Sequence, residues 1–256
     1  MTEVEWGRLK SAEIGALAAR NAVAVVPVGS IEQHGPHLPT QVDTLLAGEI
    51  GLRAARLAAA TTPVVVTPTV WSGLAEHHMS LGGTLTLDLA TFCAVLRCVC
   101  RSLARHGFRR ILLLNGHGGN MAALTAFANE IGPELQLPVA TATYWTLAKD
   151  AFAAILERQT TVRHACEAET SMLLALAPDL VDMAKAADAV GPTEVELAAV
   201  AGDAAHRYRS FKVRTRHGAI GDPRAATAEK GEKLLDAAAD AVAKLIANER
   251  FWALPA

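Results

Sequence analysis

The chain has 256 residues, of which 51% are hydrophobic, so it can bury the core of one α/β domain or of two small ones. We expect a single domain over residues 1–256. The net charge of −2 excludes a general electrostatic attraction to nucleic acid or to an acidic membrane surface. The sequence has no membrane-length apolar run and no signal-peptide core, so we expect a cytoplasmic protein that contacts no membrane and acts on a small molecule or peptide.

Short β-branched runs alternate with longer segments rich in alanine and leucine, which predicts βα units around a mostly parallel sheet. The predicted strands cover residues 22–28, 63–70, 110–115 and 138–145. The predicted helices cover residues 44–59, 89–106, 120–131, 147–158, 165–177 and 227–248, and Asp88 is the expected N-cap of the second. Residues 186–205 are interpreted as a surface loop followed by a helix. The strands are near-continuous apolar runs, so both sheet faces should be covered, which gives an α/β fold of three-layer αβα type.

Three of the four cysteines lie in the helical segment TFCAVLRCVC, residues 91–100. Cys93 and Cys100 share an apolar helix face with Leu96, which predicts packing in the core, because a disulfide frame or a zinc knuckle would need turn-rich spacing. We therefore expect free thiols and a reducing compartment.

The loop PVGSIEQHGPHLPTQVD, which follows the first predicted strand, concentrates polar side chains. Glu32 and His34 are separated by one residue, so in extended backbone both point to one face and can reach one metal ion. His37 is a further candidate in the same loop. Asp43 comes just before the next predicted helix and is either its N-cap or a third ligand. A surface loop with a helix cap is the alternative, but four such residues together favour a metal site.

The segment NGHGGN, residues 115–120, follows the third predicted strand and begins at its last residue. His117 lies between glycines, whose backbone freedom lets the histidine turn into a cleft beyond the strand, so it is a candidate ligand. The alternative is a phosphate cradle at a helix N-terminus, although the segment matches neither common glycine-rich phosphate motif.

The segment RHACEAETS brings His164 next to two acids at a predicted helix start. Glu167 and Glu169 lie in the first turns, where acids also favour the helix dipole, and that alone explains one of them. Two acids beside a histidine at the carboxyl edge of a sheet indicate that one faces a metal and that His164 transfers protons.

The candidate ligands offer oxygen and nitrogen and no thiolate, which suits catalytic Zn²⁺, Mn²⁺ or Fe²⁺ better than a structural zinc site. They outnumber the ligands that one catalytic ion needs, so we expect two divalent ions about 3.5–4 Å apart, bridged by a carboxylate such as Asp43. The predicted ligands are Glu32, His34, Asp43, His117 and Glu169.

These segments, together with LAEHHMSLGGTLTL and GAIGDPRAATAEKGE, resemble the creatininase family of metal-dependent amidohydrolases, in the order of that family's motifs. The resemblance runs from the first strand to the last helix. It implies a three-layer αβα fold, a binuclear metal centre, the five ligands named above, proton transfer by His164 and a homo-oligomer, commonly a hexamer. The expected substrate-contacting residues are Trp145, Glu76, His77 and Gly118.

The sequence departs from creatininase itself at three positions. Gly119 replaces a glutamate ligand, for which Glu169 is the natural substitute, Thr160 replaces one of two tryptophans that cover creatinine, and Arg163 replaces a glutamate. Creatinine is therefore a doubtful substrate. Family members with NGHGGN include a formamidopyrimidine-nucleotide deformylase and a mycofactocin precursor peptidase, and all of them hydrolyse an amide-type C–N bond.

The resulting hypothesis is hydrolysis of a cyclic amide, formamide or peptide by a hydroxide that bridges two metals, with His164 protonating the leaving nitrogen. A non-catalytic protein that binds a phosphorylated molecule at the NGHGG turn is one alternative, and a metal-dependent isomerase or lyase is another. Trp145 could instead pack in the core. Arg163 either binds a carboxylate or phosphate group of the substrate, or it is an ordinary surface arginine. The remaining tryptophans, Trp6, Trp71 and Trp252, are assigned to packing.

Overall fold

A computed structural model describes residues 2–192 and 207–253 of the chain. Four parallel strands form one sheet in the order β2-β1-β3-β4. In the register of this sheet, Val28 pairs with Asn115 and Asn115 with Thr143, so three strands end at one edge. The strands are β1 (Val23–Val28), β2 (Val64–Val66), β3 (Arg110–Asn115) and β4 (Val139–Thr143).

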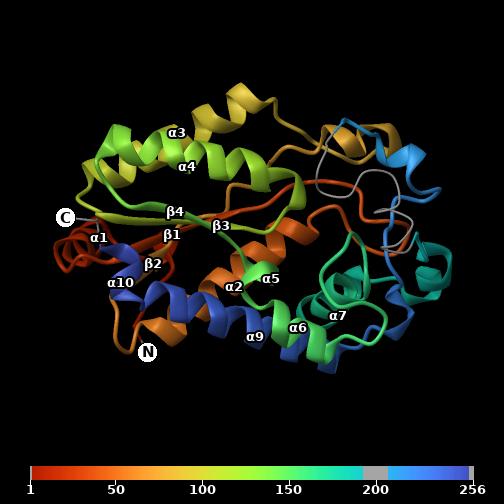
Figure 1. Cartoon of the computed structure of the whole chain (residues 1–256). Helices are drawn as coiled ribbons and strands as arrows, with labels where there is room; N and C mark the ends of the chain where they lie inside the picture. The colour runs from red at the N-terminus through yellow and green to blue at the C-terminus, as the bar shows by residue number, and fades with distance from the viewer. Residues whose placement is uncertain (1, 193–206, 254–256) are drawn as a thin grey trace.

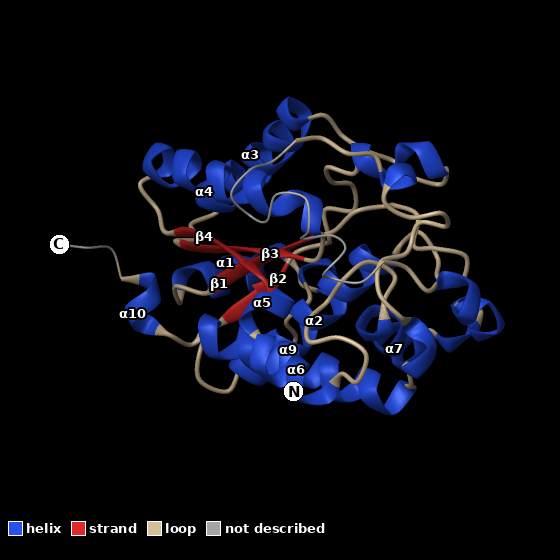
Figure 2. Ribbon diagram, turned by 45° about the vertical axis from the view of Figure 1, so that its right-hand side comes forward, coloured by secondary structure: helices blue, strands red, loops and turns tan. Residues whose placement is uncertain are grey.

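Helices cover both faces of this sheet, which confirms the predicted three-layer αβα fold (Figures 1 and 2). One layer holds α1 (Ser11–Ala19), α3 (Leu89–Arg105) and α4 (Met121–Leu135). The other holds α2 (Val42–Ala58), α5 (Tyr144–Leu147), α6 (Lys149–Ile155), α7 (Glu167–Leu176) and α9 (Ala228–Ile246).

The core divides at the sheet because alternate strand side chains point to opposite faces. Val23 and Val25 pack with α2 and α9, whereas Ala24 and Val26 pack with α1, α3 and α4. All four are fully buried, and burial of each valine side chain contributes about 1.5–3 kcal/mol. This packing fixes the strand ends from which the polar loops start.

Short helices also lie in the segments between these elements. The chain also closes with α10 (Glu249–Trp252). The 3₁₀ helices are η1 (Trp6–Arg8), η2 (Glu76–Leu81), η3 (Gly118–Asn120), η4 (Pro178–Leu180), η5 (Met183–Ala189), η7 (Phe211–Val213) and η8 (Pro223–Ala225).

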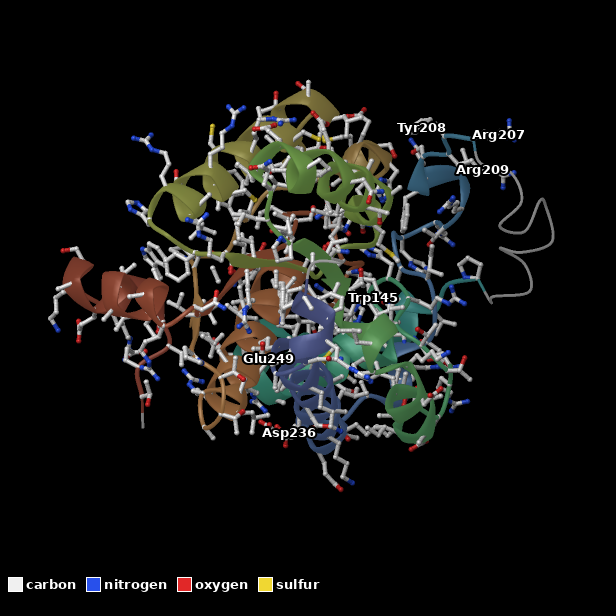
Figure 3. All side chains as sticks on the ribbon, turned by 60° about the vertical axis from the view of Figure 1, so that its left-hand side comes forward. Trp145, Arg207, Tyr208, Arg209, Asp236 and Glu249 are labelled. Carbon is white, nitrogen blue, oxygen red and sulfur yellow. The ribbon has the colours of Figure 1, made fainter. Side chains whose placement is uncertain are left out.

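Several predicted boundaries are wrong. The second strand spans only three residues, and Pro68, which has no amide hydrogen for a ladder, follows it closely. The fourth strand ends at Thr143, so Trp145 lies in α5 (Figure 3). The helix expected over residues 147–158 is shorter and corresponds to α6, whereas neither α5 nor α1 was predicted.

Other predictions have mixed outcomes. All four cysteines are free; Cys100 is buried and Cys93 packs against the core, as their shared apolar face predicts, whereas Cys98 is exposed. Trp71 is 54% exposed and does not pack in the core, whereas Trp252 is buried. Residues 193–206 of the segment interpreted as loop and helix lie outside the described residues. No helix in the described part of the chain has the length and apolar character needed to cross a membrane.

Candidate metal centre

All five predicted ligands lie together at the carboxyl edge of the sheet. Glu32 and His34 lie in the loop after β1, Asp43 in the first turn of α2, His117 directly after β3 and Glu169 in the first turn of α7. Each is at most 4% exposed. The fold therefore brings into one buried cluster residues that are up to 137 positions apart, from Glu32 to Glu169.

Two overlapping triads make up this cluster. In the first, His117 Nδ1 lies 3.0 Å from Glu32 Oε2 and 2.9 Å from Asp43 Oδ2. In the second, His34 Nε2 lies 3.2 Å from Asp43 Oδ1 and 3.9 Å from Glu169 Oε2. The ligand atoms within each triad lie within 4.8 Å of one another. Asp43 belongs to both triads and turns one carboxylate oxygen to each, which is the arrangement of a bridging ligand.

Main-chain carbonyl groups orient both histidines. His34 Nδ1–H donates to the carbonyl oxygen of Glu32 at 3.0 Å, and His117 Nε2–H donates to that of Leu74 at 3.1 Å. The other ring nitrogen of each histidine then faces the carboxylates and can bind a metal ion once it has lost its proton. Metal-binding histidines are usually held in this way.

Burial and charge shift the pKa values of the cluster strongly. Burial raises the pKa of Glu32 and raises that of Glu169 to about 8. Burial alone would lower the pKa of His34, but Asp43 and the two glutamates raise it to about 9. Without a cation, therefore, protons must balance the buried carboxylates.

The donor atoms fit divalent ions. Within the described residues, Glu32 Oε2, His34 Nε2 and Asp43 Oδ2 are buried and make no hydrogen bond. Such unsatisfied atoms are costly unless something else binds them. Two metal ions, one in each triad, would satisfy all three, and the mixed oxygen and nitrogen set suits Zn²⁺, Mn²⁺ or Fe²⁺.

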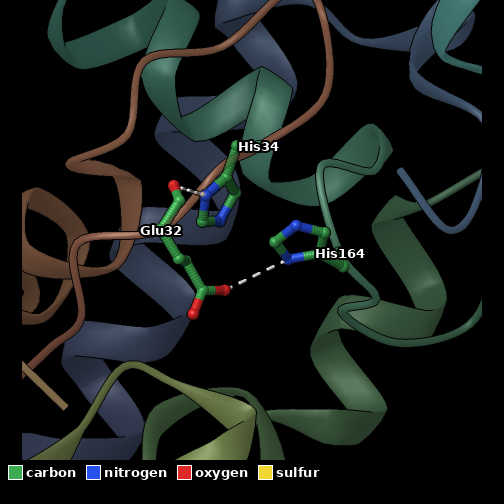
Figure 4. Close-up of side chains that lie close together, drawn as sticks. All are labelled: Glu32, His34 and His164. Carbon is green, nitrogen blue, oxygen red and sulfur yellow. Dashed lines mark hydrogen bonds and ion pairs between the residues drawn. The ribbon is translucent and has the colours of Figure 1, made fainter. Parts of the chain in front are cut away.

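His164 lies beside the cluster, at the point where Figure 4 shows it facing Glu32. Its Nδ1 lies 3.4 Å from Glu32 Oε1, and its Nε2–H donates to the main-chain oxygen of Gln33 at 2.8 Å. Burial and the neighbouring His34 and His78 hold the pKa of His164 well below its usual value, so the ring is neutral. It can accept a proton at Nδ1, although His164 also forms with Glu32 and His34 a third group that could hold a metal ion.

Sequence reasoning missed Gln33 and His78. The Gln33 amide donates to His78 Nδ1 at 2.7 Å, which leaves the proton on Nε2, 3.3 Å from Glu32 Oε1. This contact holds the carboxylate of Glu32 in place. The signal was present in the glutamine between two candidate ligands and in the histidine pair of AEHH, but only the turn of η2 shows which histidine points inward.

Some candidates face elsewhere. Glu76, a predicted substrate contact, is exposed and does not line the cavity described below. His37 is buried but bonds through Nε2 to Thr170 Oγ1 at 2.8 Å, outside both triads. Asp43 is not a helix cap, because it lies inside α2. Glu167 accepts hydrogen bonds from two backbone amides and from Lys230, so of the two adjacent acids Glu169 faces the cluster.

A cavity of about 840 Å³ opens above the cluster. This is room for a substrate of drug-like size. Its walls include His77, Gly118, Trp145, Arg163 and His164, with Glu32, Asp43, His117 and Glu169 also in the lining. Thr160 does not line this cavity and is exposed.

Comparison with known proteins agrees with this geometry. The chain is 30% identical over 251 residues to creatinine amidohydrolase of Pseudomonas putida, and the match covers 91% of this chain and 92% of the relative. It is also 30% identical over 249 residues to the mycofactocin precursor peptide peptidase of Mycobacterium tuberculosis, with 94% and 91% covered.

Solved creatininase structures share the fold. One, named as a manganese form, superposes with a TM-score of 0.83 at 28% identity and covers 97% of this chain and 99% of its own. Another, a mutant creatininase of Zn-Zn type, gives a TM-score of 0.80 at 28% identity with the same coverage. The family model for creatinine amidohydrolase matches residues 7–246, which include both triads and His164, and the chain therefore belongs to the creatininase family of hydrolases.

Proposed function

We propose that this hydrolase is a binuclear metal-dependent amidohydrolase that cleaves an amide-type C–N bond in a cyclic amide, a formamide or a peptide. The observation that carries this proposal is the pair of buried triads that share Asp43, since one carboxylate then serves two positions. The two relatives compared above are named for creatinine and for a precursor peptide, and solved relatives are named for manganese and for a zinc pair.

Each of the two triads would bind one metal ion. Glu32, Asp43 and His117 would hold one ion and His34, Asp43 and Glu169 the other. Bound divalent ions supply Lewis acidity toward a carbonyl oxygen and lower the pKa of water toward neutrality.

His164 supplies proton transfer. Its neutral ring can take a proton at Nδ1 and deliver it to the departing nitrogen, which leaves poorly as an anion. This role requires the tautomer in which Nε2 donates its proton to the main-chain carbonyl of Gln33, 2.8 Å away.

The alternative of a phosphate site at the NGHGG turn is less well supported. His117 of that turn lies about 3 Å from two buried carboxylates, Glu32 and Asp43, which would repel a phosphate group bound there. An isomerase or lyase would use the same ions, and substrate tests separate it from a hydrolase.

Metal content per subunit, measured by mass spectrometry, tests the proposal. We expect two ions in the parent protein, loss of both in Asp43→Asn and loss of mainly one in His117→Ala. Glu76→Gln, which removes a nearby exposed acid, is the control and should keep both ions. Absence of metal from the parent, under conditions in which a control zinc enzyme retains its ion, would refute the proposal.

Activity tests the role of His164. On a substrate found by screening cyclic amides, formamides and short peptides, His164→Ala should lower kcat by about 10²–10⁴ and keep both ions. Loss of metal in this variant would instead make His164 a ligand.

The wider organisation is a proposal too, in which the length favours one domain, the lack of targeting segments favours the cytoplasm and the family resemblance implies a homo-oligomer. Residues 1–256 are expected to act as one domain in a cytoplasmic homo-oligomer, with a hexamer as the form to test by light scattering.

A further inference from the structure

The cavity separates charge between its floor and its mouth. The acids in its described lining are the three carboxylates of the proposed metal ligands, at the floor. The described residues of the lining also include Arg163, Arg209 and Arg214, with Trp145, Tyr208 and Phe211. Tyr208 and Arg209 follow one another along a segment above Trp145 in Figure 3. If two ions balance the acids below, the mouth carries a net positive charge.

One aromatic ring connects Arg214 to the site. Its guanidinium group lies 5.7 Å from the centre of the Phe211 ring, and Phe211 is 5% exposed. The Phe211 ring centre lies 3.9 Å from that of His78 and 4.9 Å from that of His164. Arg214 is therefore one ring away from the histidine proposed to transfer protons.

The two arginines repel one another. Burial and the charge of Arg209 both lower the pKa of Arg214, and burial, His117 and Arg214 lower that of His77 to about 4. Among the described residues, neither Arg209 nor Arg214 forms an ion pair with a carboxylate, whereas other arginines, such as Arg53 and Arg97, do pair with acids. Two adjacent cations without an anion are unfavourable, and an anion placed between them relieves the repulsion.

We propose that the substrate carries a carboxylate or phosphate group near its scissile amide, and that Arg209 and Arg214 bind this group at the cavity mouth. The proposal rests on the proposed function, because it concerns the same cavity. Guanidinium groups suit this task, since their planar donors match the paired oxygens of both anions. The arginines would thus select anionic amides over neutral ones such as creatinine.

The test is binding of unreactive probes rather than turnover. Hydroxamates chelate metal ions, so the monohydroxamates of succinic, glutaric and adipic acid present an anion at three distances from the floor. Each is compared by calorimetry with its uncharged primary amide and with a phosphonate of the same length. At the best length, we expect the metal-loaded protein to bind an anionic probe about tenfold more tightly than the amide, or about 1.4 kcal/mol. This preference should fall as salt concentration rises.

The matched variants separate a local effect from the overall charge. Arg209→Gln/Arg214→Gln should lose the preference and bind the neutral amides as the parent does. Arg207→Gln removes a neighbouring charge on a residue that does not line the cavity, so it should keep the preference. The ratio of carboxylate to phosphonate affinity identifies which anion the site prefers.

Two failures remain distinguishable. Equal affinity for anionic and neutral probes at every length, with both bound only when metal is present, would overturn the arginine proposal and leave the metal centre standing. Failure of every hydroxamate to bind, with no metal found in the protein, would overturn the proposed function and the arginine proposal together.

Discussion

Gly119 offers a sharp test of how His117 is held. A Cβ atom at this position would lie 2.4 Å from His117 Nε2 and 2.4 Å from the carbonyl oxygen of Leu74. These two atoms form the 3.1 Å hydrogen bond that turns Nδ1 of His117 toward Glu32 and Asp43. Gly119→Ala therefore inserts a methyl group into this bond and must displace the histidine ring or the carbonyl.

The size of the effect follows from the role of that bond. Loss of an outer hydrogen bond to a metal-binding histidine typically lowers metal affinity about 10- to 100-fold, which is about 1.4–2.7 kcal/mol. Only the triad that contains His117 should lose this affinity, because His34 is oriented by a different carbonyl. Gly118→Ala is the matched control, since a Cβ atom there would meet nothing within 4 Å.

Competition with a chromophoric chelator measures the two zinc affinities separately. In Gly119→Ala we expect one constant to weaken by that factor and the other to change little, whereas Gly118→Ala should retain both. Identical constants in the two alanine variants would refute the assignment of the Leu74 carbonyl as the group that orients His117.

Two further predictions concern pH. At pH 7 the metal-free protein should hold protons on His34, with a pKa of about 9, on Glu169, with a pKa of about 8, and on His117. Zinc uptake should therefore release about three protons, which calorimetry in buffers of different ionisation enthalpy counts. Release of one proton or fewer would contradict the described cluster. Burial lowers the pKa of His37 to about 4 from its ordinary 6.5, so its contribution to stability is complete above pH 6.5 and falls with pH, by about 2 kcal/mol between pH 7 and pH 5. Urea unfolding of chelator-treated parent and His37→Gln should show this extra acid sensitivity only in the parent, and parallel pH profiles would contradict it.

Local patterns were sufficient for the layers of the fold. Strands such as Val23–Val28 are short and fully apolar, and helices such as α9 carry apolar residues at helical spacing, so the sequence predicts a sheet covered on both sides. The boundaries were less predictable where one residue is compatible with two structures. Trp145 suits a strand by its propensity, but β4 ends two residues earlier, at Thr143, and Trp145 lies in α5, which packs against α9.

The candidate site was predictable where chemistry and spacing coincide. Glu32 and His34 share a loop after a strand, and His117 lies in a glycine turn after another, so all three were expected at one sheet edge. Their roles as metal ligands stay predictions until metal content is measured. Gln33 and His78 could not be assigned in the same way, because a glutamine and one histidine of a pair acquire a role only through a contact across 45 positions.

The sequence by itself determined three features of this protein. These are the apolar pattern of buried strands, a set of candidate oxygen and nitrogen ligands without thiolates, and an order of motifs that places the chain in its family. Only the tertiary structure decided which groups meet. It turned Asp43 inward from α2 to face both histidines, directed His37 and Glu167 to other partners, and brought two arginines to the mouth above three carboxylates. The physical reason is that spacing fixes the direction of a side chain only along one element, whereas its partner depends on how separate elements pack.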